Sequence, residues 1–323
     1  MFKVALIGCG RIAYQLEHDP LRYKPCTHLG ALRYWKKRHQ KISFSAFCDT
    51  DAERAKQAAV FAEARETLIS RDAHEVISTH PDLLVIAATT HAHAELLLAA
   101  LDAGIPRIVL EKPVARSANE AGRLQRAIRR SRSVVLPNYE RRYHPKYLRL
   151  RDELGREKRP GSYRAFFSAG GRSLYAGRNK NDEGVLLHDT THLLDLAQFL
   201  YGPLKRHSVI AEKRRHFLML EHTSGATGSI ETVLGNGVFH LEMELHLAQS
   251  RVIVGNGFLD RQPIRQSPHY RSFRSYAAGK RQVDKAFPLS KNPFIALYRE
   301  AIFGKPTNTH FKEALENVRI LCN

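Results

Sequence analysis

The 323-residue sequence is poor in cysteine. No two of its four cysteines form a CxxC pair: they are Cys9, Cys26, Cys48 and Cys322. A disulfide framework or a cysteine-based zinc site needs paired spacing. We therefore expect four free thiols in a reducing compartment, the cytoplasm.

Long apolar runs are also missing. The longest is about Leu83 to Ala88, whereas a membrane-spanning helix needs roughly 20 apolar residues. No basic and apolar leader precedes the strand-like run Phe2–Ile7, so we expect no signal peptide. Hydrophobic residues at 43% and charged residues at 26% are typical of a folded protein and exclude a disordered one.

Acidic residues are scarce beside 51 lysines and arginines, which gives a net charge of +19. Such a charge attracts anions: phosphorylated or nucleotide-linked substrates, nucleic acid or anionic lipid. The densest basic stretch, Arg123 to Arg151, begins with arginines at helical spacing opposite Leu124 and Ile128. This pattern favours a solvated helix face over a ligand site. No aromatic ladder or zinc spacing accompanies the charge, so a dedicated nucleic-acid reader is not expected.

The length favours two domains over one core. The first third alternates apolar strands, expected at 2–7, 42–48, 83–88, 108–110 and 134–136, with helices expected at 51–64, 92–103 and 119–130. Strands that are apolar throughout and separated by helices predict a parallel sheet with both faces covered.

The pattern changes after about Pro145. β-prone stretches with polar alternation follow at 163–167, 208–210, 217–221, 227–233, 238–246 and 251–254, with turn signals at 224–225 and 235–237. They predict a mostly antiparallel open sheet. A helix at about 191–201 interrupts them, a polar loop is expected at 260–289, and a final helix at 311–321.

The glycine motif Gly8-Cys9-Gly10-Arg11-Ile12-Ala13 fits G-x-G-x-x-G/A directly after the first strand. The first glycine permits a tight turn, the second lets the backbone approach a pyrophosphate, and the small third residue permits close packing of a helix whose N-terminus attracts phosphate. Alone, the motif could be an ordinary glycine turn. The preceding strand and an acid at the end of the second strand favour dinucleotide binding.

That acid, Asp49, could accept hydrogen bonds from the adenosine ribose hydroxyls, which favours NAD over NADP. Asp49 or Thr50 could instead cap the following helix, and Arg54 nearby could admit NADP. Asp49 lies about twice as far from Gly8 as the usual spacing of about 20 residues.

The excess falls around His18–Thr27, where Pro20 and Pro25 forbid a continuous helix. We expect an insertion here, either a cap over the active site or a surface loop.

The glycine motif, the triplet Glu111-Lys112-Pro113 and a later histidine-containing helix together resemble the Gfo/Idh/MocA oxidoreductase family, over nearly the whole chain. The resemblance implies a catalytic Lys112 that bridges the substrate hydroxyl and the nicotinamide, a Glu111 that fixes the loop, and a cis bond at Pro113. A lysine at the carboxyl edge of a parallel sheet faces the ligand crevice, and its ammonium can lower the pKa of an alcohol. Without the other motifs, a surface lysine in a proline turn would be the simpler interpretation.

Two further segments carry the resemblance. The run 89–95 is similar to the family's turn beside the nicotinamide, which implies cofactor contacts from Thr89, Thr90 and His93, although Thr90 could also cap a helix. The run 138–145 is similar to the segment that crosses between domains. Its expected cleft residues are Asn138, Arg141 and Arg142.

The third site lies in the run from Gly184 to Asp195. The family usually shows Asp-x-x-x-His with a trailing Asp. Here His192 matches the histidine, while His188 stands at the position of the leading Asp and Asp189 one residue later. These positions share roughly one helix face. The expected site is therefore a histidine pair with a nearby carboxylate, which leaves the proton acceptor open: a histidine is competent for this role, and either His188 or Asp189 stands in place of the family carboxylate. No third ligand has matching spacing, so a metal is not expected.

The expected fold is α/β: a Rossmann domain at 1–137, an α+β substrate-binding and oligomerisation domain at 138–309, and a C-terminal helix at 310–323 that packs back on the first domain. The expected function is hydride transfer between NAD, or alternatively NADP, and a secondary alcohol or ketone of a sugar, cyclitol or nucleotide sugar, with Lys112 and His192 managing the hydroxyl proton. The charge favours an anionic substrate, and the alternation along Val238–His246 favours a homo-oligomer. A non-catalytic NAD(P) sensor is the alternative, because His188 replaces the family's Asp.

Overall fold

The computed structural model describes residues 1–169, 182–234, 237–284, 288–307 and 309–322, with the backbone alone at 169, 182–186 and 309. It divides into two compact units. The first joins Met1–His144 to Pro288–Asn323, and the second is Pro145–Phe287. The expected boundary at residue 137 is therefore seven residues early, and 288–309 lie in the first unit instead of the second.

The first unit is built on a six-stranded sheet in the order β3-β2-β1-β4-β5-β6, with every pair parallel. Its strands are β1 (Phe2–Ile7), β2 (Ile42–Cys48), β3 (Leu68–Ser70), β4 (Leu83–Ile86), β5 (Arg107–Leu110) and β6 (Val134–Pro137). This is the doubly wound Rossmann order, which confirms the predicted parallel sheet. The strand order reverses between β1 and β4, where ligands of such sheets bind beyond the carboxyl ends.

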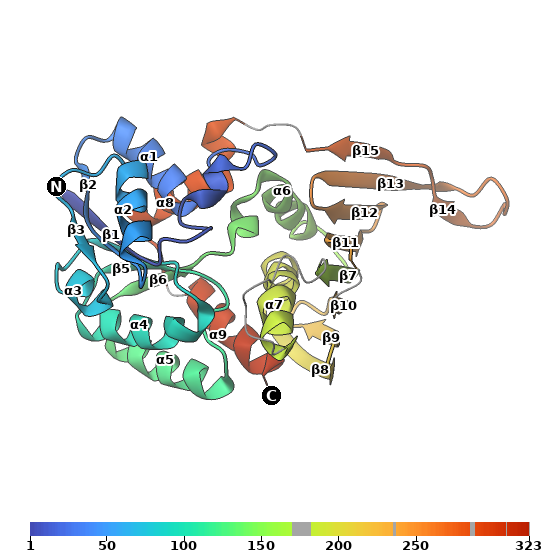
Figure 1. The fold of residues 1–323 in the computed structure, drawn as a ribbon. Helices are drawn as coiled ribbons and strands as arrows, with labels where there is room; N and C mark the ends of the chain where they lie inside the picture. Colours follow the sequence, from blue (N-terminus) through green and yellow to red (C-terminus); the bar gives the residue numbers. More distant parts are fainter. Residues whose placement is uncertain (170–181, 235–236, 285–287, 308, 323) are drawn as a thin grey trace. The chain divides into compact units, whose positions relative to one another are not determined.

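Helices cover both faces of this sheet (Figure 1). One face carries α1 (His28–Arg38), α2 (Ala52–Phe61) and α8 (Pro293–Phe303). The other carries α3 (Ala73–Ile77), α4 (Thr90–Asp102), α5 (Ala118–Arg130) and α9 (Thr309–Leu321). The end of the chain thus adds one helix to each face. Arg107 ties α8 to β5 by donating to the carbonyls of Ala301 and Ile302 at 2.6 and 2.9 Å.

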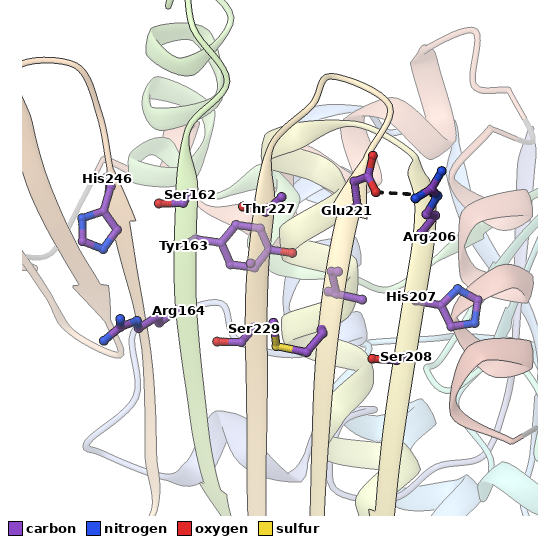
Figure 2. A pocket seen from close by; sticks show the side chains of 13 residues that line it. Ser162, Tyr163, Arg164, Arg206, His207, Ser208, Glu221, Thr227, Ser229 and His246 are labelled. Carbon is purple, nitrogen blue, oxygen red and sulfur yellow. Dashed lines mark ion pairs between the residues drawn. The ribbon is translucent and has the colours of Figure 1, made fainter.

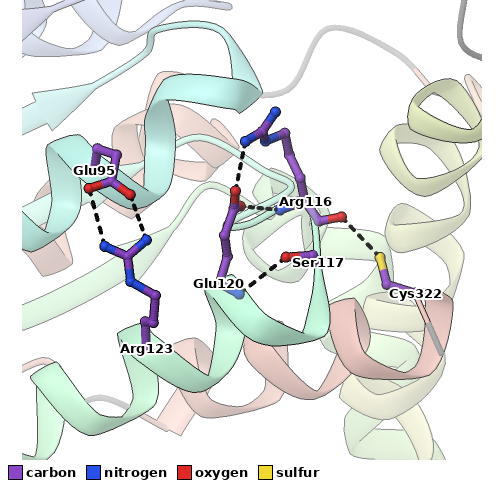
Figure 3. Close-up of polar contacts among 6 residues, drawn as sticks. All are labelled: Glu95, Arg116, Ser117, Glu120, Arg123 and Cys322. Atoms are coloured by element: carbon purple, nitrogen blue, oxygen red, sulfur yellow. Dashed lines mark hydrogen bonds and ion pairs between the residues drawn. The ribbon is translucent and has the colours of Figure 1, made fainter.

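Helix α5 shows why the basic stretch forms a helix face (Figure 3). Ser117 caps the helix, its hydroxyl accepting from the Glu120 amide at 3.1 Å. Ala121, Leu124 and Ile128 are buried. Arg123 pairs with Glu95 of α4 at 2.7 Å, and Arg126 and Arg130 are exposed. The expected solvated face is confirmed.

Two helix starts differ from the expectation because a different side chain forms the cap. Asp51, one residue beyond the expected Thr50, caps α2 by accepting from the Glu53 amide at 3.0 Å. Thr89, not Thr90, is the N-cap residue of α4, and its side chain makes no capping bond.

The second unit contains a nine-stranded sheet in the order β14-β13-β12-β11-β7-β10-β9-β8, with β15 paired to β13. Its strands are β7 (Ser162–Ala169), β8 (Leu204–Glu212), β9 (Arg215–His222), β10 (Thr227–Leu234), β11 (His240–His246), β12 (Ser250–Gly255), β13 (Phe258–Gln266), β14 (Arg274–Tyr276) and β15 (Lys280–Val283). Only β7 and β10 pair in parallel among these strands, so the predicted mostly antiparallel sheet is confirmed.

Two helices belong to this unit, α6 (Pro145–Leu154) and α7 (Asp182–Tyr201). Helix α7 packs on β7, β9 and β10, and α6 packs on α7. Along β11, Leu241, Met243 and Leu245 are buried, whereas Glu242 and Glu244 alternate with them on the open face. The turn signal expected at 235–237 falls largely outside the described residues.

The expectation of a loop at 260–289 is wrong for residues 260–266, 274–276 and 280–283. These residues belong to β13, β14 and β15, and β13 pairs antiparallel with both of the others (Figure 1). Side chains along β13 are only partly buried or exposed at every position, so no alternation of apolar and polar residues marks the strand. Backbone pairing alone makes it one. None of the helices in the described part of the chain has the length and apolar content to cross a bilayer.

Candidate functional site

The turn after β1 contains two glycines, and the structure accounts for each of them differently. Gly8 has φ +92°, and an added Cβ would lie 2.4 Å from the Ala88 backbone nitrogen. The fold itself therefore requires glycine at this position. An added Cβ at Gly10 would meet no atom within 4 Å. Nothing in the fold requires glycine at position 10, which leaves close approach of a ligand as the reason.

The backbone amides of Gly10, Arg11 and Ile12 make no hydrogen bond within the described residues. Consecutive unpaired amides of this kind form a nest that binds anions. The expected helix does not follow the turn. The 3-10 helix η1 (Gln15–His18) comes next, and α1 begins only at His28. The turn itself, and not a long helix, offers the donors.

Asp49 is tied to the same turn. Its Oδ2 accepts from the Cys9 amide at 2.8 Å, and its Oδ1 accepts from the Asp51 amide at 3.0 Å. Arg54 pairs with Asp51 at 3.3 Å. Arg71 donates from Nε to the Thr50 carbonyl at 3.0 Å. Arg71 escaped the sequence analysis because strand β3, which carries the chain to it, was not expected.

Glu111 follows β5 and is buried at the carboxyl edge of the sheet. Its Oε1 accepts from Asn138 Nδ2 at 2.5 Å and lies 3.0 Å from His28 Nε2. Its Oε2 accepts from the Lys112 amide at 3.3 Å. The Lys112–Pro113 bond is cis, as the resemblance implied.

The ionisation of Glu111 is set by these neighbours. Burial acts to raise the pKa of this carboxyl, but the hydrogen bond and charge of His28, with Lys112 and Asn138, outweigh it and lower the pKa to about 2. The group is therefore a carboxylate beside the backbone of Lys112, which is half-buried.

His28 is a residue that the sequence analysis missed. It is fully buried at the start of α1, and its Nδ1 lies 2.8 Å from the Tyr298 hydroxyl of α8. The available signal was a histidine directly after the Thr27 N-cap of α1, whose hydroxyl accepts from the Gly30 amide. The partner on α8 gave no signal because that helix was not expected.

His93 is buried, with both ring nitrogens near carbonyl oxygens. Nδ1 lies 2.8 Å from the Pro113 oxygen and Nε2 lies 3.0 Å from the Ala88 oxygen. Burial lowers the pKa of His93 against the effect of these carbonyls. The ring therefore links the loop after β4 to the loop that carries Lys112. The Thr89 hydroxyl oxygen lies 3.4 Å from His91 Nε2.

The two arginines expected at the cleft are engaged within the first unit. Arg142 is buried and pairs with Glu313 of α9 at 2.7 Å. Arg141 pairs with Glu140 at 3.0 Å. Asn138 lies directly after β6, where its backbone N–H donates to the Leu110 carbonyl at 2.8 Å.

The expected insertion is present and folded. Glu17 Oε1 accepts from the Cys26 amide at 2.6 Å and from the Thr27 hydroxyl at 2.8 Å. Lys24 Nζ donates to the Asp19 carbonyl at 2.7 Å, and Asn292 Nδ2 donates to the Pro25 carbonyl at 2.8 Å. Contacts to its own ends and to the segment before α8 hold this loop in place.

The second unit holds the histidines of α7. His188 Nδ1 lies 2.9 Å from Asp189 Oδ1, and the rings of His188 and His192 meet edge to face at 6.3 Å. The acid is buried and His188 is partly exposed. The buried Asp189 carboxylate is therefore placed to orient the His188 ring. Within the described residues, no three His, Cys, Asp or Glu side chains converge as a metal site.

Comparison with known proteins bears on both units. Residues 2–139 match the family model GFO_IDH_MocA, described as an oxidoreductase family with an NAD-binding Rossmann fold. A D-apiose dehydrogenase from Paraburkholderia graminis is 28% identical over 251 residues, which cover 71% of this chain and 60% of that protein. The first unit is thus similar to the NAD-binding domain of this oxidoreductase family.

Two further proteins are similar to this chain. An inositol 2-dehydrogenase/D-chiro-inositol 3-dehydrogenase from Shouchella clausii is 30% identical over 162 residues, which are 48% of this chain and 40% of that protein. The matches thus span less than two thirds of either curated relative. The solved structure of levoglucosan dehydrogenase in complex with NADH has the same fold, with a TM-score of 0.74 at 17% identity over 99% of this chain and 95% of that one.

The residues that carry the similarity to the family model gather at the carboxyl edge of the first sheet. The glycine turn, Asp49 and the Glu111–Lys112 segment all follow strands of that sheet at the same edge. The histidine–carboxylate pair belongs to the second unit and is described apart from it.

Proposed function

We propose that this protein is an NAD(P)-dependent oxidoreductase that transfers hydride between the nicotinamide and a secondary alcohol or ketone of a carbohydrate. The observation that best supports this proposal is the turn at Gly10–Ile12. Three unpaired amides border an open space there, and Asp49 is bonded to the same turn. A dinucleotide supplies a pyrophosphate for the amides and a ribose for the carboxylate.

Asp49 supports NAD as the preferred form. Two backbone amides fix its carboxylate, and each oxygen keeps a lone pair that can accept from a ribose hydroxyl. A 2′-phosphate would meet a fixed negative charge. Arg54 and Arg71 lie near this end of the sheet, so NADP remains the alternative cofactor.

The proposed chemistry divides between two kinds of side chain. The nicotinamide, when bound, accepts or returns the hydride at its ring. Lys112 holds the substrate oxygen and favours its deprotonated form through its positive charge. The proton that leaves this oxygen goes to an imidazole, His192 or His188. Asp189 accepts from Nδ1–H of His188, which makes Nε2 the basic nitrogen of the neutral ring.

The substrate class follows from the relatives and the charge. The curated relatives are named for D-apiose and inositols, so we propose a sugar, cyclitol or nucleotide sugar. A net charge of +19 supports an anionic member of that class, such as a sugar acid or nucleotide sugar.

We also propose a homo-oligomer formed through the open face of the second unit's sheet. Helix α7 covers one face of this sheet at β7, β9 and β10. The opposite face holds an open hollow of about 670 Å³ over β7 to β10 (Figure 2). Arg164, Ser208 and Ser229 line it together with Met219, which is 53% exposed. A strictly monomeric mass in light scattering at micromolar concentration would refute this contact.

The four cysteines are unpaired, which supports a reducing compartment, and we propose the cytoplasm.

A titration and a screen test the function together. NADH binding is measured first, by fluorescence or calorimetry. A panel of sugars, cyclitols, sugar acids and nucleotide sugars is then incubated with NAD⁺ or NADP⁺, and the absorbance of the reduced nicotinamide is followed. Binding with turnover of one substrate class supports the enzyme. Binding without turnover across the panel favours the sensor, and absence of NADH binding contradicts both.

A further inference from the structure

We propose that Tyr298, His28 and Glu111 form a buried chain of hydrogen bonds that fixes the amide of Asn138, so that Asn138 Oδ1 accepts a hydrogen bond from a neutral donor of a bound ligand. The inference rests on the proposed function. The donor is an N–H or O–H group, from the carboxamide of the nicotinamide or from a carbohydrate hydroxyl. Tyr298 and His28 are positioning residues, because they act through Glu111.

The directions of the two hydrogen bonds to Glu111 Oε1 follow from its charge. Glu111 is a carboxylate and can only accept. Asn138 must therefore turn its NH₂ group toward Glu111 Oε1, at 2.5 Å, and His28 must donate from Nε2, at 3.0 Å. On the other side of the ring, His28 Nδ1 is hydrogen-bonded to the Tyr298 hydroxyl at 2.8 Å. One orientation of the Asn138 amide satisfies the carboxylate.

Burial makes this arrangement firm. His28 and Tyr298 are fully buried, and Glu111 is 7% exposed. Burial also keeps the pKa of Tyr298 well above its ordinary value, so its hydroxyl stays a donor. A flipped Asn138 amide would set its oxygen against the carboxylate oxygen. That contact between two acceptors excludes the flip.

The fixed orientation leaves one atom without a partner. Asn138 is 2% exposed, and its Oδ1 makes no hydrogen bond within the described residues. Buried acceptors are nearly always satisfied in folded proteins. Asn138 follows β6 and bonds to the end of β5, at the edge of the sheet where dinucleotides bind. A ligand donor at this edge is the partner that the chain itself does not supply.

The test compares NADH with reduced 3-acetylpyridine adenine dinucleotide, in which an acetyl group replaces the carboxamide and removes its N–H donor. Asn138→Ala removes the acceptor. Asn138→Ser keeps a short donor for Glu111 and serves if the alanine variant does not fold. His222→Gln is the control, because His222 is another buried histidine bonded to a tyrosine, in the second unit.

If the carboxamide is the donor, the preference of the wild type for NADH falls by about threefold to tenfold in the Asn138 variants and is unchanged in His222→Gln. If a carbohydrate hydroxyl is the donor, that preference is unchanged and KM for the substrate found in the screen rises by a similar factor. The proposal is overturned if neither quantity changes. Absence of NADH binding by the wild type instead contradicts the proposed function, and this inference falls with it.

A second measurement tests the positioning residues without substrate. In ¹⁵N-labelled protein, Nε2 of His28 should carry a proton, and Tyr298→Phe should remove the hydrogen bond at Nδ1 and shift its resonance. Tyr34→Phe is the matched control, because Tyr34 lies apart on the outer part of α1 against Arg38. A His28 ring with no proton on Nε2 would overturn the proposed chain.

Discussion

Substituting the two glycines of the turn separately distinguishes folding from cofactor binding. At Gly10, an added Cβ meets no atom within 4 Å. Gly10→Val should therefore change the free energy of unfolding by no more than about 0.5 kcal/mol, as at other sites without special contacts. At Gly8, the left-handed backbone alone costs roughly 1–2 kcal/mol for any other residue. The Cβ would also lie 2.4 Å from the Ala88 nitrogen, so Gly8→Ala should destabilise by more.

Binding should respond in the opposite order. A pyrophosphate on this turn accepts from two or three of the unpaired amides at 10–12. Each hydrogen bond to a charged group contributes about 1.5–3 kcal/mol. A valine side chain occupies the space through which the phosphates approach. Loss of even two such bonds removes about 3 kcal/mol, so NADH should bind more than about 100-fold weaker to Gly10→Val.

Thermal unfolding and NADH titration, run on the same preparations, measure both quantities. The expected pattern is a wild-type Tm with lost binding for Gly10→Val, and a lowered Tm for Gly8→Ala. If Gly10→Val bound NADH as tightly as the wild type, the assignment of this turn to the pyrophosphate would be wrong.

Three further outcomes follow from the proposed roles. Lys112→Ala and His192→Ala should each lower turnover by about 10²–10⁴-fold, which is the usual effect of losing a general acid or base. The affinity for NADH should be nearly unchanged. Near-normal turnover in both variants would favour the non-catalytic sensor. His188→Asp should retain part of the activity, whereas Asp189→Ala should lower turnover further because it releases the His188 ring, and the reverse order would contradict this role. The pKa of Glu111 is lowered from 4.5 to about 2. The stability that its charge provides is therefore complete above about pH 4.5 and is lost as the pH falls through about 2. The free energy of unfolding, measured in urea across this range, should decline more steeply for the wild type than for Glu111→Gln.

Five of the six strands of the first sheet could be predicted because their signal is local, whereas β3 was not expected. β1 and β2 are mostly apolar segments that end at a glycine turn and an acid, and their bounds match the expectation. The glycine turn, Asp49 and the cis bond at Pro113 were likewise found from short motifs. The parallel order of the strands follows from the alternation of strand and helix.

The segments that the sequence analysis missed lack such a signal. β13 carries partly exposed side chains throughout, so its partners and not its own pattern make it a strand. Helix α8 is apolar and well capped by Asn292, but it comes after the second unit in the chain. Its place beside α1 in the first unit depends on where the chain returns, which local propensity does not encode.

Sequence alone determined the parts that rest on backbone sterics and periodicity: the turn at Gly8, the apolar strands and the cap positions to within a residue or two. Tertiary structure decided which polar groups meet. His28, Glu111, Asn138 and Tyr298 come from four separate segments, and parallel strands bring the segments after β5 and β6 to one edge. The physical reason is that a buried hydrogen bond depends on distance and direction in space, whereas a sequence motif records only spacing along the chain.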